Sequence, residues 1–522
     1  MAEKNQIVVS EKKRKRIKKF ETIYQAPFDF RIEIQDKTIL KIKELANKHN
    51  FEIYLVGGYV RDLLLNRPKK DADFTVVGDS IEFAKIVANH FHSKVVAYPR
   101  FFTAMVPVKG SEFEFVGTRK EAYLPKSRKP IVSVGTLEDD LRRRDFTINA
   151  LAISLQEDSF GKLIDLFDGY KDLQNKIIRT PLDPQATFND DPLRMLRAIR
   201  FSAQLDFDIE EQTFTALTEM RERIKIISQE RITAELLKII DSPRPGKGFL
   251  LLFQSGLLEL VFPELYAMAG VETVEENGIK FSHKDVFLHS LKVLDKVAEH
   301  SDNTYLRLAA LIHDIGKPKT KRFISGVGWT FHGHEEVGAR MVSSIFRHLK
   351  LPMENVEYVE KLVRLHQRPM ALVDDGVTDS AIRRLAAYAG ETLEDLFLLC
   401  RCDITTNNPN LSKKYLNNYQ KVWKKVLLVQ EKDKLRQFQS PVRGEEIMEI
   451  FDLKPSPEVG VIKTAIEEAI LDGIIPNDYD KAKEFVLENK ERWKNILSSI
   501  NVSEIKKDKD LIKKIFVFSA SK

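Results

Sequence analysis

The hydrophobic pattern changes its period several times within the first third of the chain. Apolar residues recur at helical spacing over residues 39–49, and a stretch rich in β-branched and aromatic residues follows at 51–56. Gly57 and Gly58 interrupt that stretch before a short helical pattern at 59–66. This alternation predicts a small head in which helices cover a mixed sheet. Further short strands are expected at 71–77, 95–98, 104–108 and 112–117.

The pattern becomes helical after Leu173. From Asp191 to about Leu265 the apolar residues recur on one face of successive helices, as expected of a bundle with a buried stripe. Residues typical of that stripe are Met195, Ile199, Leu237 and Ile240. Eight of the eleven histidines lie within 276–410, a concentration that a purely structural bundle does not need.

These patterns predict an α+β fold, with a mixed-sheet head followed by all-α regions. A chain of 522 residues is too long for one hydrophobic core, so several domains are expected. The predicted limits are 1–25 for a basic arm, 26–155 for the head, 156–275 for a helical neck, 276–410 for the histidine-rich domain and 411–522 for a helical tail.

The charge balance favours a nucleic-acid partner. The formal net charge is +6 with a pI of about 8.8. Residues 12–19 contain seven lysines and arginines, which form either a solvated tail or an arm that contacts RNA phosphates.

The two cysteines, Cys400 and Cys402, lie too close in sequence for a relaxed disulfide, which favours a reducing cytoplasm. No apolar run approaches the roughly 18 residues of a membrane-spanning helix, and the N-terminus lacks an apolar signal segment.

Two carboxylates on one expected strand indicate metal chemistry. Asp71 and Asp73 are two residues apart, so they would point to the same side of the strand. Paired carboxylates repel each other unless a cation lies between them, and Mg²⁺ is the usual choice where phosphates supply other ligands. Such a site can activate a 3′-hydroxyl and stabilise departing pyrophosphate.

The glycine pair narrows this chemistry to triphosphates. Gly57 and Gly58 let the backbone approach a ligand, the following helix offers free N–H groups, and Arg61 could add a charged donor. A glycine pair or an Asp-x-Asp pair alone is common by chance. Both within 17 residues, in strand–turn–helix–strand order, are much more specific.

Four motifs now carry a resemblance to a known family. Residues 57–62 (GGYVRD) with 71–73 (DAD) resemble the signature of bacterial CCA-adding enzymes and poly(A) polymerases, which belong to the DNA polymerase β superfamily. Residues 143–150 (RRDFTINA), 165–173 (DLFDGYKDL) and 190–194 (DDPLR), continuing to Arg200 and Phe201, resemble the second, third and fourth motifs. The resemblance covers residues 30–265 and implies a nucleotidyltransferase head.

The later motifs imply how a nucleotide is held. Asp191 precedes Pro192 and can cap a helix, but it can also accept a hydrogen bond from a base. Arg194 lies three residues on and can share that face. In the resembled family these two positions select C or A. The second motif serves the ribose and phosphates there, although Asn149 could equally stabilise a turn. The implied nucleotide-binding residues are Gly57, Gly58, Arg61, Arg144, Asp145, Asn149, Asp191, Arg194 and Arg197.

A third metal-binding carboxylate has two candidates. Glu114 is favoured over Asp145 by strand alternation, which gives a predicted catalytic set of Asp71, Asp73 and Glu114 with Mg²⁺. Asp190 stands where the family more often has Glu, and Phe102 where it often has Gly. The second departure could alter the loop beside the site.

A second constellation lies in the histidine-rich domain. Imidazole and carboxylate ligands suit divalent metals. Their order resembles the HD phosphohydrolase superfamily, which implies a metal site of His289, His313, Asp314, His334, His366 and Asp403 for Mg, Mn, Ni or another divalent ion. His332 is an alternative to His334, whereas His283, His300 and His348 are not expected to be ligands.

The two resemblances together imply template-independent addition of CCA to the 3′ end of tRNA. The expected partners are tRNA, CTP and ATP, and the expected state is a monomer or homodimer. The histidine-rich domain would remove phosphates or open 2′,3′-cyclic phosphates on RNA ends. Alternatives are a poly(A) polymerase, an enzyme that adds only CC or only A, and an HD phosphohydrolase whose head merely binds RNA.

Overall fold

The computed structural model describes residues 30–68, 71–124, 127–276, 279–373, 378–406, 408–433, 440–500, 502 and 508–517. The chain divides into two compact units, the first formed by Met1–Ala267 with His348–Leu351 and the second by Met268–Arg347 with Pro352–Lys522. The basic run at 12–19 lies outside the described residues. No helix in the described part of the chain is long and apolar enough to cross a membrane.

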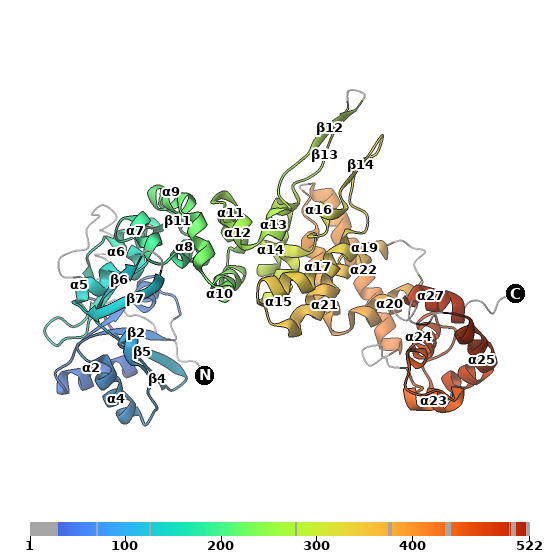
Figure 1. The fold of residues 1–522 in the computed structure, drawn as a ribbon, viewed down its shortest axis with the longest axis horizontal. Helices are drawn as coiled ribbons and strands as arrows, with labels where there is room; N and C mark the ends of the chain where they lie inside the picture. The colour runs from blue at the N-terminus through green and yellow to red at the C-terminus, as the bar shows by residue number, and fades with distance from the viewer. Residues whose placement is uncertain are drawn as a thin grey trace. The chain divides into compact units, whose positions relative to one another are not determined.

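The first unit contains a seven-stranded sheet in the order β3-β4-β5-β2-β1-β8-β9 (Figure 1). Only the β2–β5 pair is parallel, so the sheet is mixed as predicted. Its strands are β1 (Glu52–Val56), β2 (Ala72–Val77), β3 (Val96–Tyr98), β4 (Thr103–Val108), β5 (Ser111–Gly117), β8 (Leu151–Ser154) and β9 (Leu163–Asp165).

An aromatic core holds α4 (Ser80–Phe91) against this sheet. Phe115 of β5 stacks on Phe74 of β2 with ring centroids 5.0 Å apart, and Phe83 of α4 meets Phe115 edge-on at 5.5 Å. All three are buried, and α2 (Lys37–Lys48) packs against β1 with Ile39 and Ile42 inside. This packing fixes the registers that bring polar residues of β2 and β5 together.

Two features of the head differ from the predicted pattern. β9 was not among the predicted strands; it pairs with β8 because the chain turns back into the sheet after one loop. A hairpin of β6 (Arg119–Leu124) and β7 (Ser127–Val134) was not predicted.

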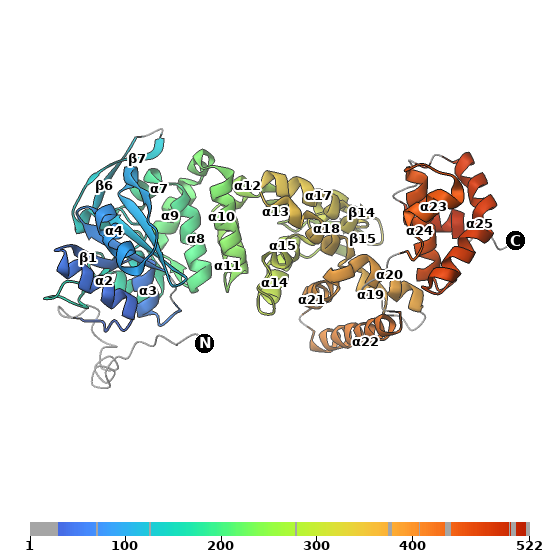
Figure 2. The ribbon, with the colours of Figure 1, turned by 90° about the horizontal axis from the view of Figure 1, so that it is seen from below.

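Helices predominate in the rest of the first unit, where β10 (Ile177–Ile178) and β11 (Asp208–Ile209) form a short parallel pair. α8 (Leu193–Leu205) packs against α10 (Gln229–Ile240) and α11 (Pro245–Gln254) (Figure 2). Three of the predicted stripe residues are buried, whereas Leu237 is only half-buried because it lies at the edge of the α10 stripe. The other helices are α3 (Gly58–Leu64), α5 (Leu137–Arg142), α6 (Gly169–Asn175), α7 (Pro184–Asp190), α9 (Glu211–Glu219), α12 (Leu257–Val261) and α13 (Pro263–Tyr266).

The second unit begins with a helical domain that carries most of the histidines. Two hairpins that the helical spacing did not predict project from it in Figure 1, β12 (Thr273–Glu276) with β13 (Ile279–Ser282) and β14 (Arg322–Ile324) with β15 (Gly328–Thr330). Its helices are α14 (Val286–Ala298), α15 (Thr304–Ile312), α16 (Lys317–Thr320), α17 (His334–His348), α18 (Val356–Leu365), α19 (Arg368–Ala371), α20 (Asp379–Ala389), α21 (Leu393–Asp403) and α22 (Pro409–Asp433).

The last helices form a core of their own around Trp493, with Phe451 and Phe516 packed on its ring. Arg384 and Ser380 of α20 bond Asp472 at 2.5 and 2.6 Å and tie this C-terminal module to the preceding helices. Its helices are α23 (Gly444–Phe451), α24 (Pro457–Leu471), α25 (Tyr479–Ser499) and α27 (Lys509–Ile512). The fold is therefore α+β, with helical regions after a mixed-sheet head.

Candidate functional sites

Two carboxylates are register partners where β2 and β5 run side by side, and a third lies just before β2. Asp73 and Glu114 are register partners in the parallel β2–β5 pair. Asp71 lies just before β2 rather than inside it, and its Oδ1 accepts a hydrogen bond of 2.9 Å from the backbone N–H of Glu112. Parallel pairing therefore places Glu114 beside the Asp71–Asp73 pair, as strand alternation predicted.

The electrostatics of these carboxylates favour a bound cation. Burial raises the pKa of Asp73, and the Asp71 carboxylate raises it further, against the opposing effect of Arg144. Burial and the Asp73 charge likewise raise the pKa of Glu114. Mutual repulsion of this kind is relieved by a divalent ion, and carboxylate oxygens are the donors that Mg²⁺ prefers.

Gly57 permits a close approach on the other side of Asp73. Its φ of +70° is a conformation that residues with a Cβ rarely adopt. A Cβ at this position would lie 2.8 Å from Nη1 of Arg144 and 3.4 Å from Oδ2 of Asp73. The turn between β1 and α3 therefore lies directly against a carboxylate and a guanidinium, with Gly58 as the first residue of α3.

A buried chain of hydrogen bonds links α3 to α8. Arg61 donates to Oδ1 of Asn149 at 2.8 Å, and Nδ2 of Asn149 donates to Asp145 at 2.9 Å. Arg197 completes the chain with bonds of 2.8 and 2.5 Å to Asp145. Burial opposes the charge of Asp145, but Arg197 and Asn149 outweigh it and lower its pKa to about 2. Asp145 is thus committed to this chain and does not join the three carboxylates.

The third motif, residues 165–173, supports this chain of hydrogen bonds by packing against residues 147–149. The Asp172 carboxylate accepts a 2.6 Å bond from the Thr147 hydroxyl and a 2.9 Å bond from Arg179. Gly169 lies so close to this turn that a Cβ on it would fall 2.2 Å from the Thr147 carbonyl oxygen. Asp165 accepts 2.9 Å bonds from the N–H groups of Gly169 and Tyr170. The motif therefore packs α6 against residues 147–149.

Asp140 is a central residue that the sequence analysis missed. It is fully buried on α5 and accepts a 3.0 Å bond from the Thr75 hydroxyl of β2. Burial opposes its charge, but the guanidiniums of Arg144 and Arg143 outweigh that and lower its pKa. Asp140 thus orients both arginines beside Asp73. The available signal was its spacing of three and four residues from Arg143 and Arg144.

The two predicted base-reading residues are engaged with other groups. Oδ1 of Asp191 accepts from the N–H of Leu193 at 3.1 Å, which caps the start of α8, and Oδ2 pairs with Arg231 of α10 at 3.1 Å. Arg194 donates to the carbonyl of Arg143 at 2.6 Å. Both interpretations of Asp191 therefore remain compatible, because it caps a helix and still presents a partly exposed carboxylate.

The second cluster is organised around Asp314, which is buried. Its Oδ2 lies 3.3 Å from Nε2 of His313 and 3.7 Å from Nε2 of His289, and its Oδ1 lies 3.2 Å from Nε2 of His334 and 3.7 Å from Nε2 of His366. His289 also bonds Asp403 at 2.9 Å. All six predicted residues thus come together, and two overlapping groups of them have ligand atoms within 4.8 Å of one another.

Three of the imidazoles are held in the orientation that a metal ligand needs. Nδ1 of His313, His334 and His366 bonds the carbonyl oxygen three residues earlier, at 2.8, 2.9 and 2.6 Å. Each ring therefore donates from Nδ1 and leaves Nε2 facing Asp314. Nε2 of His313 is buried with no hydrogen-bond partner among the described residues. This donor set fits a divalent metal.

The structure places His334 in the cluster and the histidines of this domain that are not predicted ligands outside it. His334 is buried in the cluster, whereas His332 is exposed. His300 bonds the carbonyl of Lys296, and His348 pairs with Glu264, so neither joins the cluster. The ring of His283 packs edge-on against Trp329 at the mouth of a pocket.

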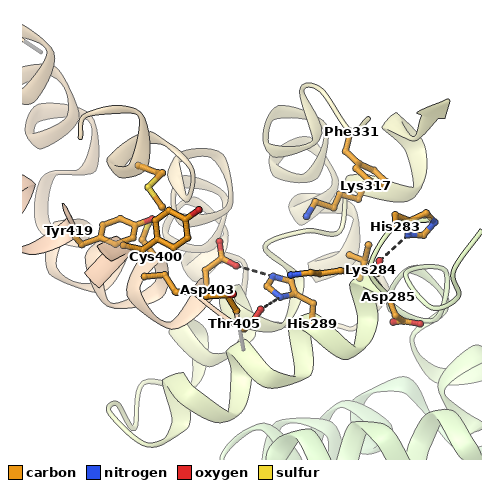
Figure 3. Close-up of a pocket in the computed structure, with 15 residues that line it drawn as sticks. His283, Lys284, Asp285, His289, Lys317, Phe331, Cys400, Asp403, Thr405 and Tyr419 are labelled. Atoms are coloured by element: carbon orange, nitrogen blue, oxygen red, sulfur yellow. Dashed lines mark hydrogen bonds and ion pairs between the residues drawn. The ribbon is translucent and has the colours of Figure 1, made fainter. Parts of the chain in front are cut away.

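That pocket, of about 320 Å³, opens on one side of the cluster (Figure 3). His289 and Asp403 reach its surface, with 17% and 28% of their side chains exposed, while Asp314 lies behind them at 2%. Lys317 connects the pocket to the buried Asp314, since its side chain lines the pocket and its Nζ bonds Oδ2 of Asp314 at 2.6 Å. Cys400 also lines the pocket, and both cysteines are free thiols.

Three family models match successive parts of the chain. "Poly A polymerase head domain" matches residues 53–179, "Probable RNA and SrmB- binding site of polymerase A" matches 206–268, and "HD domain" matches 286–408. The first match contains the three carboxylates of the head, and the third contains the histidine and aspartate cluster.

Two relatives and a solved structure extend this similarity. The chain is 34% identical over 345 residues to the A-adding tRNA nucleotidyltransferase of Deinococcus radiodurans, which is 64% of this chain and 75% of that protein. It is 30% identical over 413 residues to the Multifunctional CCA protein of Pseudoalteromonas atlantica, 76% of this chain and 96% of that protein. Its fold resembles the Bacillus stearothermophilus CCA-adding enzyme in complex with CTP, with a TM-score of 0.59, 24% identity, and coverage of 89% of this chain and all of the other.

Proposed function

The chain belongs to the tRNA nucleotidyltransferase family of CCA-adding and A-adding enzymes, and from this premise we propose that its head adds CCA to tRNA 3′ ends. The observation that carries the proposal is the pairing of Asp73 with Glu114 beside Asp71, against a glycine turn and two arginines. The reaction would be an in-line attack of the RNA 3′-hydroxyl on the α-phosphate of CTP or ATP.

Each group of this site has a task in that reaction. Asp71, Asp73 and Glu114 would hold Mg²⁺, which when bound lowers the pKa of the attacking hydroxyl and neutralises the leaving pyrophosphate. Gly57 and Gly58 leave room for the triphosphate, and Arg144, oriented by Asp140, supplies positive charge next to it. Arg61, Asn149, Asp145 and Arg197 brace that arrangement.

We assign base selection to Asp191 and Arg194. A carboxylate accepts from the exocyclic amine that cytosine and adenine share, and a guanidinium donates to the adjacent ring nitrogen. The bond from Arg194 to the carbonyl of Arg143 supports this assignment, because it places the guanidinium next to the arginines of the proposed phosphate site.

Full CCA addition is distinguished from CC-only, A-only or poly(A) addition by one experiment. The full-length protein is incubated with tRNA ending at the discriminator base, with CTP, ATP or both, and the products are sequenced. We expect CC with CTP alone and CCA with both nucleotides. Runs of A would indicate a poly(A) polymerase, and no addition by the wild type would refute the proposal.

For the second cluster we propose hydrolysis of phosphates at RNA 3′ ends. The observation that favours it is the set of four imidazoles and two carboxylates next to an open pocket. A divalent metal held there would supply a nucleophilic hydroxide at neutral pH. Removal of a terminal or 2′,3′-cyclic phosphate would restore the 3′-hydroxyl that the head requires.

That second proposal is tested with RNA ending in a 2′,3′-cyclic phosphate and with Mg²⁺, Mn²⁺ or Ni²⁺ in turn. Ring opening or phosphate release is expected, and Asp314→Ala should abolish it. Absence of product with all three metals would contradict the proposal. A monomer or homodimer and the stated domain limits remain predictions, as does a cytoplasmic location, which the two free thiols support.

A further inference from the structure

The pocket beside the second cluster has the chemical character of a nucleotide site. Its volume of about 320 Å³ is at the small end of the roughly 300–1,000 Å³ of ligand pockets. The lining combines the aromatic rings of Phe331, Tyr415 and the largely buried Tyr419 with the basic side chains of Lys284 and Lys317, beside the carboxylates of Asp285 and Asp403. Rings of this kind stack on bases and ammonium groups attract phosphate, so the lining matches both parts of one nucleotide.

One wall of this pocket belongs to α22, which has an unusual charge pattern. Tyr415 and Tyr419 of α22 line the pocket, and Figure 3 labels Tyr419 there. The same helix contains five lysines and no acidic residue over residues 409–428. By contrast, eleven lysines and arginines are outnumbered by fifteen acidic residues in the described C-terminal module, residues 440–500, 502 and 508–517. Positive charge is thus concentrated on the helix that borders the pocket.

Three of the lysines of α22 form a row along one side of the helix, which we call the lysine row. Lys421 and Lys425 lie seven and eleven residues after Lys414, which places all three on one side of a helix. That side flanks the buried stripe of Tyr419, Val422 and Val426. The row extends for about 16 Å. No ion pair joins any of these three lysines to another residue of the described chain.

We propose that the pocket takes the 3′-terminal nucleotide of single-stranded RNA, and that the chain behind it runs along the lysine row of α22. The inference rests on the phosphate chemistry proposed for the second cluster and names how its substrate is held. It predicts that the cluster prefers an RNA end over a free nucleotide, because only a chain reaches the row. It also divides the predicted RNA-binding tail, since α22 binds RNA and the acidic module does not.

The pocket is tested with a short oligoribonucleotide that ends in 4-thiouridine 3′-phosphate. After photocrosslinking to the full-length protein, the modified peptides are mapped by mass spectrometry. We expect crosslinks at Phe331 and at Tyr415. Crosslinks confined to the first unit would overturn the inference.

The row is tested in the same assay with Lys414, Lys421 and Lys425 each replaced by Glu. The three lost contacts should weaken oligonucleotide binding at least about tenfold and reduce the slope of log affinity against log salt by about 2. Binding of uridine 3′-monophosphate should not change. The matched control replaces the exposed Lys454, Lys463 and Lys514 of the C-terminal module with Glu and should leave both affinities unchanged. Equal losses of oligonucleotide affinity in the two variants would contradict a specific role of the lysine row.

Phosphate release from the same oligonucleotide separates this inference from the function on which it rests. Pocket crosslinks without release would sink the proposed hydrolysis and leave the RNA path standing. Release without pocket crosslinks would do the reverse.

Discussion

The two clusters balance charge in opposite ways. In the head, Asp73 and Glu114 are register partners with Asp71 nearby, and burial, followed by the repulsion between these carboxylates, raises the pKa of Asp73 and Glu114. In the second cluster, Asp314 and Asp403 alternate with imidazoles. Burial opposes their charges, but the neighbouring histidines, together with Lys317 in the case of Asp314, outweigh it and hold both pKa values well below the ordinary range.

This difference predicts whether each site binds its metal before the substrate or together with it. In the head cluster carboxylates of like charge lie near one another, and the phosphates of a nucleotide would supply further ligands, so we expect a metal to bind there together with the nucleotide. The second cluster has its rings already oriented by backbone carbonyls and should bind a metal by itself. One site is therefore assembled by its substrate and the other is preformed.

The largest expected effect is the loss of nucleotidyl transfer in Asp73→Asn. Removing one of the charges that we propose to hold Mg²⁺ should lower kcat/KM for CTP incorporation at least about a thousandfold. Metal binding by the second cluster should be unchanged, because no ligand is shared. Radiolabelled incorporation and calorimetric metal titration measure the two properties, and a parallel loss of both would break the comparison.

Metal binding without nucleotide should be lost next, in Asp314→Asn. Asp314 contacts all four histidines of the cluster, so Mn²⁺ affinity in calorimetry should fall at least about a hundredfold. The matched control is His300→Gln, which alters an exposed histidine outside the cluster. If the wild type binds no divalent metal without RNA, the second cluster is not preformed and the contrast fails.

A smaller effect is expected from Gly57→Ala. The added methyl would collide with Arg144 and require a strained φ, so kcat/KM for nucleotide addition should fall about 10- to 100-fold. Gly78→Ala is the matched control, because its φ of +110° carries the backbone strain but no atom lies within 4 Å of the added carbon. Equal losses would mean that strain alone, rather than the approach to Arg144, limits the turn.

The smallest effect is a pH-dependent change in stability from Asp145→Asn. With a pKa of about 2 in the folded state and about 3.9 when unfolded, Asp145 stabilises the first unit above pH 4, by about 2 to 3 kcal/mol. That stabilisation is lost as the pH falls from about 4 to about 2. Calorimetric unfolding of wild type and variant should therefore differ at neutral pH and converge in acid. A constant difference would contradict this assignment.

The sequence predicted what depends on period and spacing. Strand alternation favoured Glu114, which the structure places beside Asp73, and motif order named six residues that the structure brings together, whereas their roles remain predictions. It could not separate His332 from His334, because both lie within one loop-to-helix transition and only the packing of α17 buries the second. Asp140 was missed because its spacing from Arg143 and Arg144 indicates only local ion pairs, whereas its burial against β2 depends on a tertiary contact.

The hairpins were missed for a related reason. β14 and β15 have three residues each, too few for an alternating pattern to be distinguished from a loop, and their pairing is supported by contacts such as Lys321 over the Trp329 ring. The neck was predicted better, because long amphipathic helices repeat their signal over several turns.

The ion pair between Asp191 and Arg231 has a consequence for fidelity. Both carboxylate oxygens of Asp191 already accept hydrogen bonds before any nucleotide binds. A partly exposed pair of this kind contributes roughly 1 kcal/mol, so a base with a donor at the right position can replace Arg231 at little cost. Cytosine at C4 and adenine at C6 carry an amino group, whereas uracil and guanine carry at the same positions a carbonyl oxygen that cannot substitute for a guanidinium. The resident arginine would thus act as a competitor that only a matching base displaces, so rejection of the wrong nucleotide needs no steric barrier.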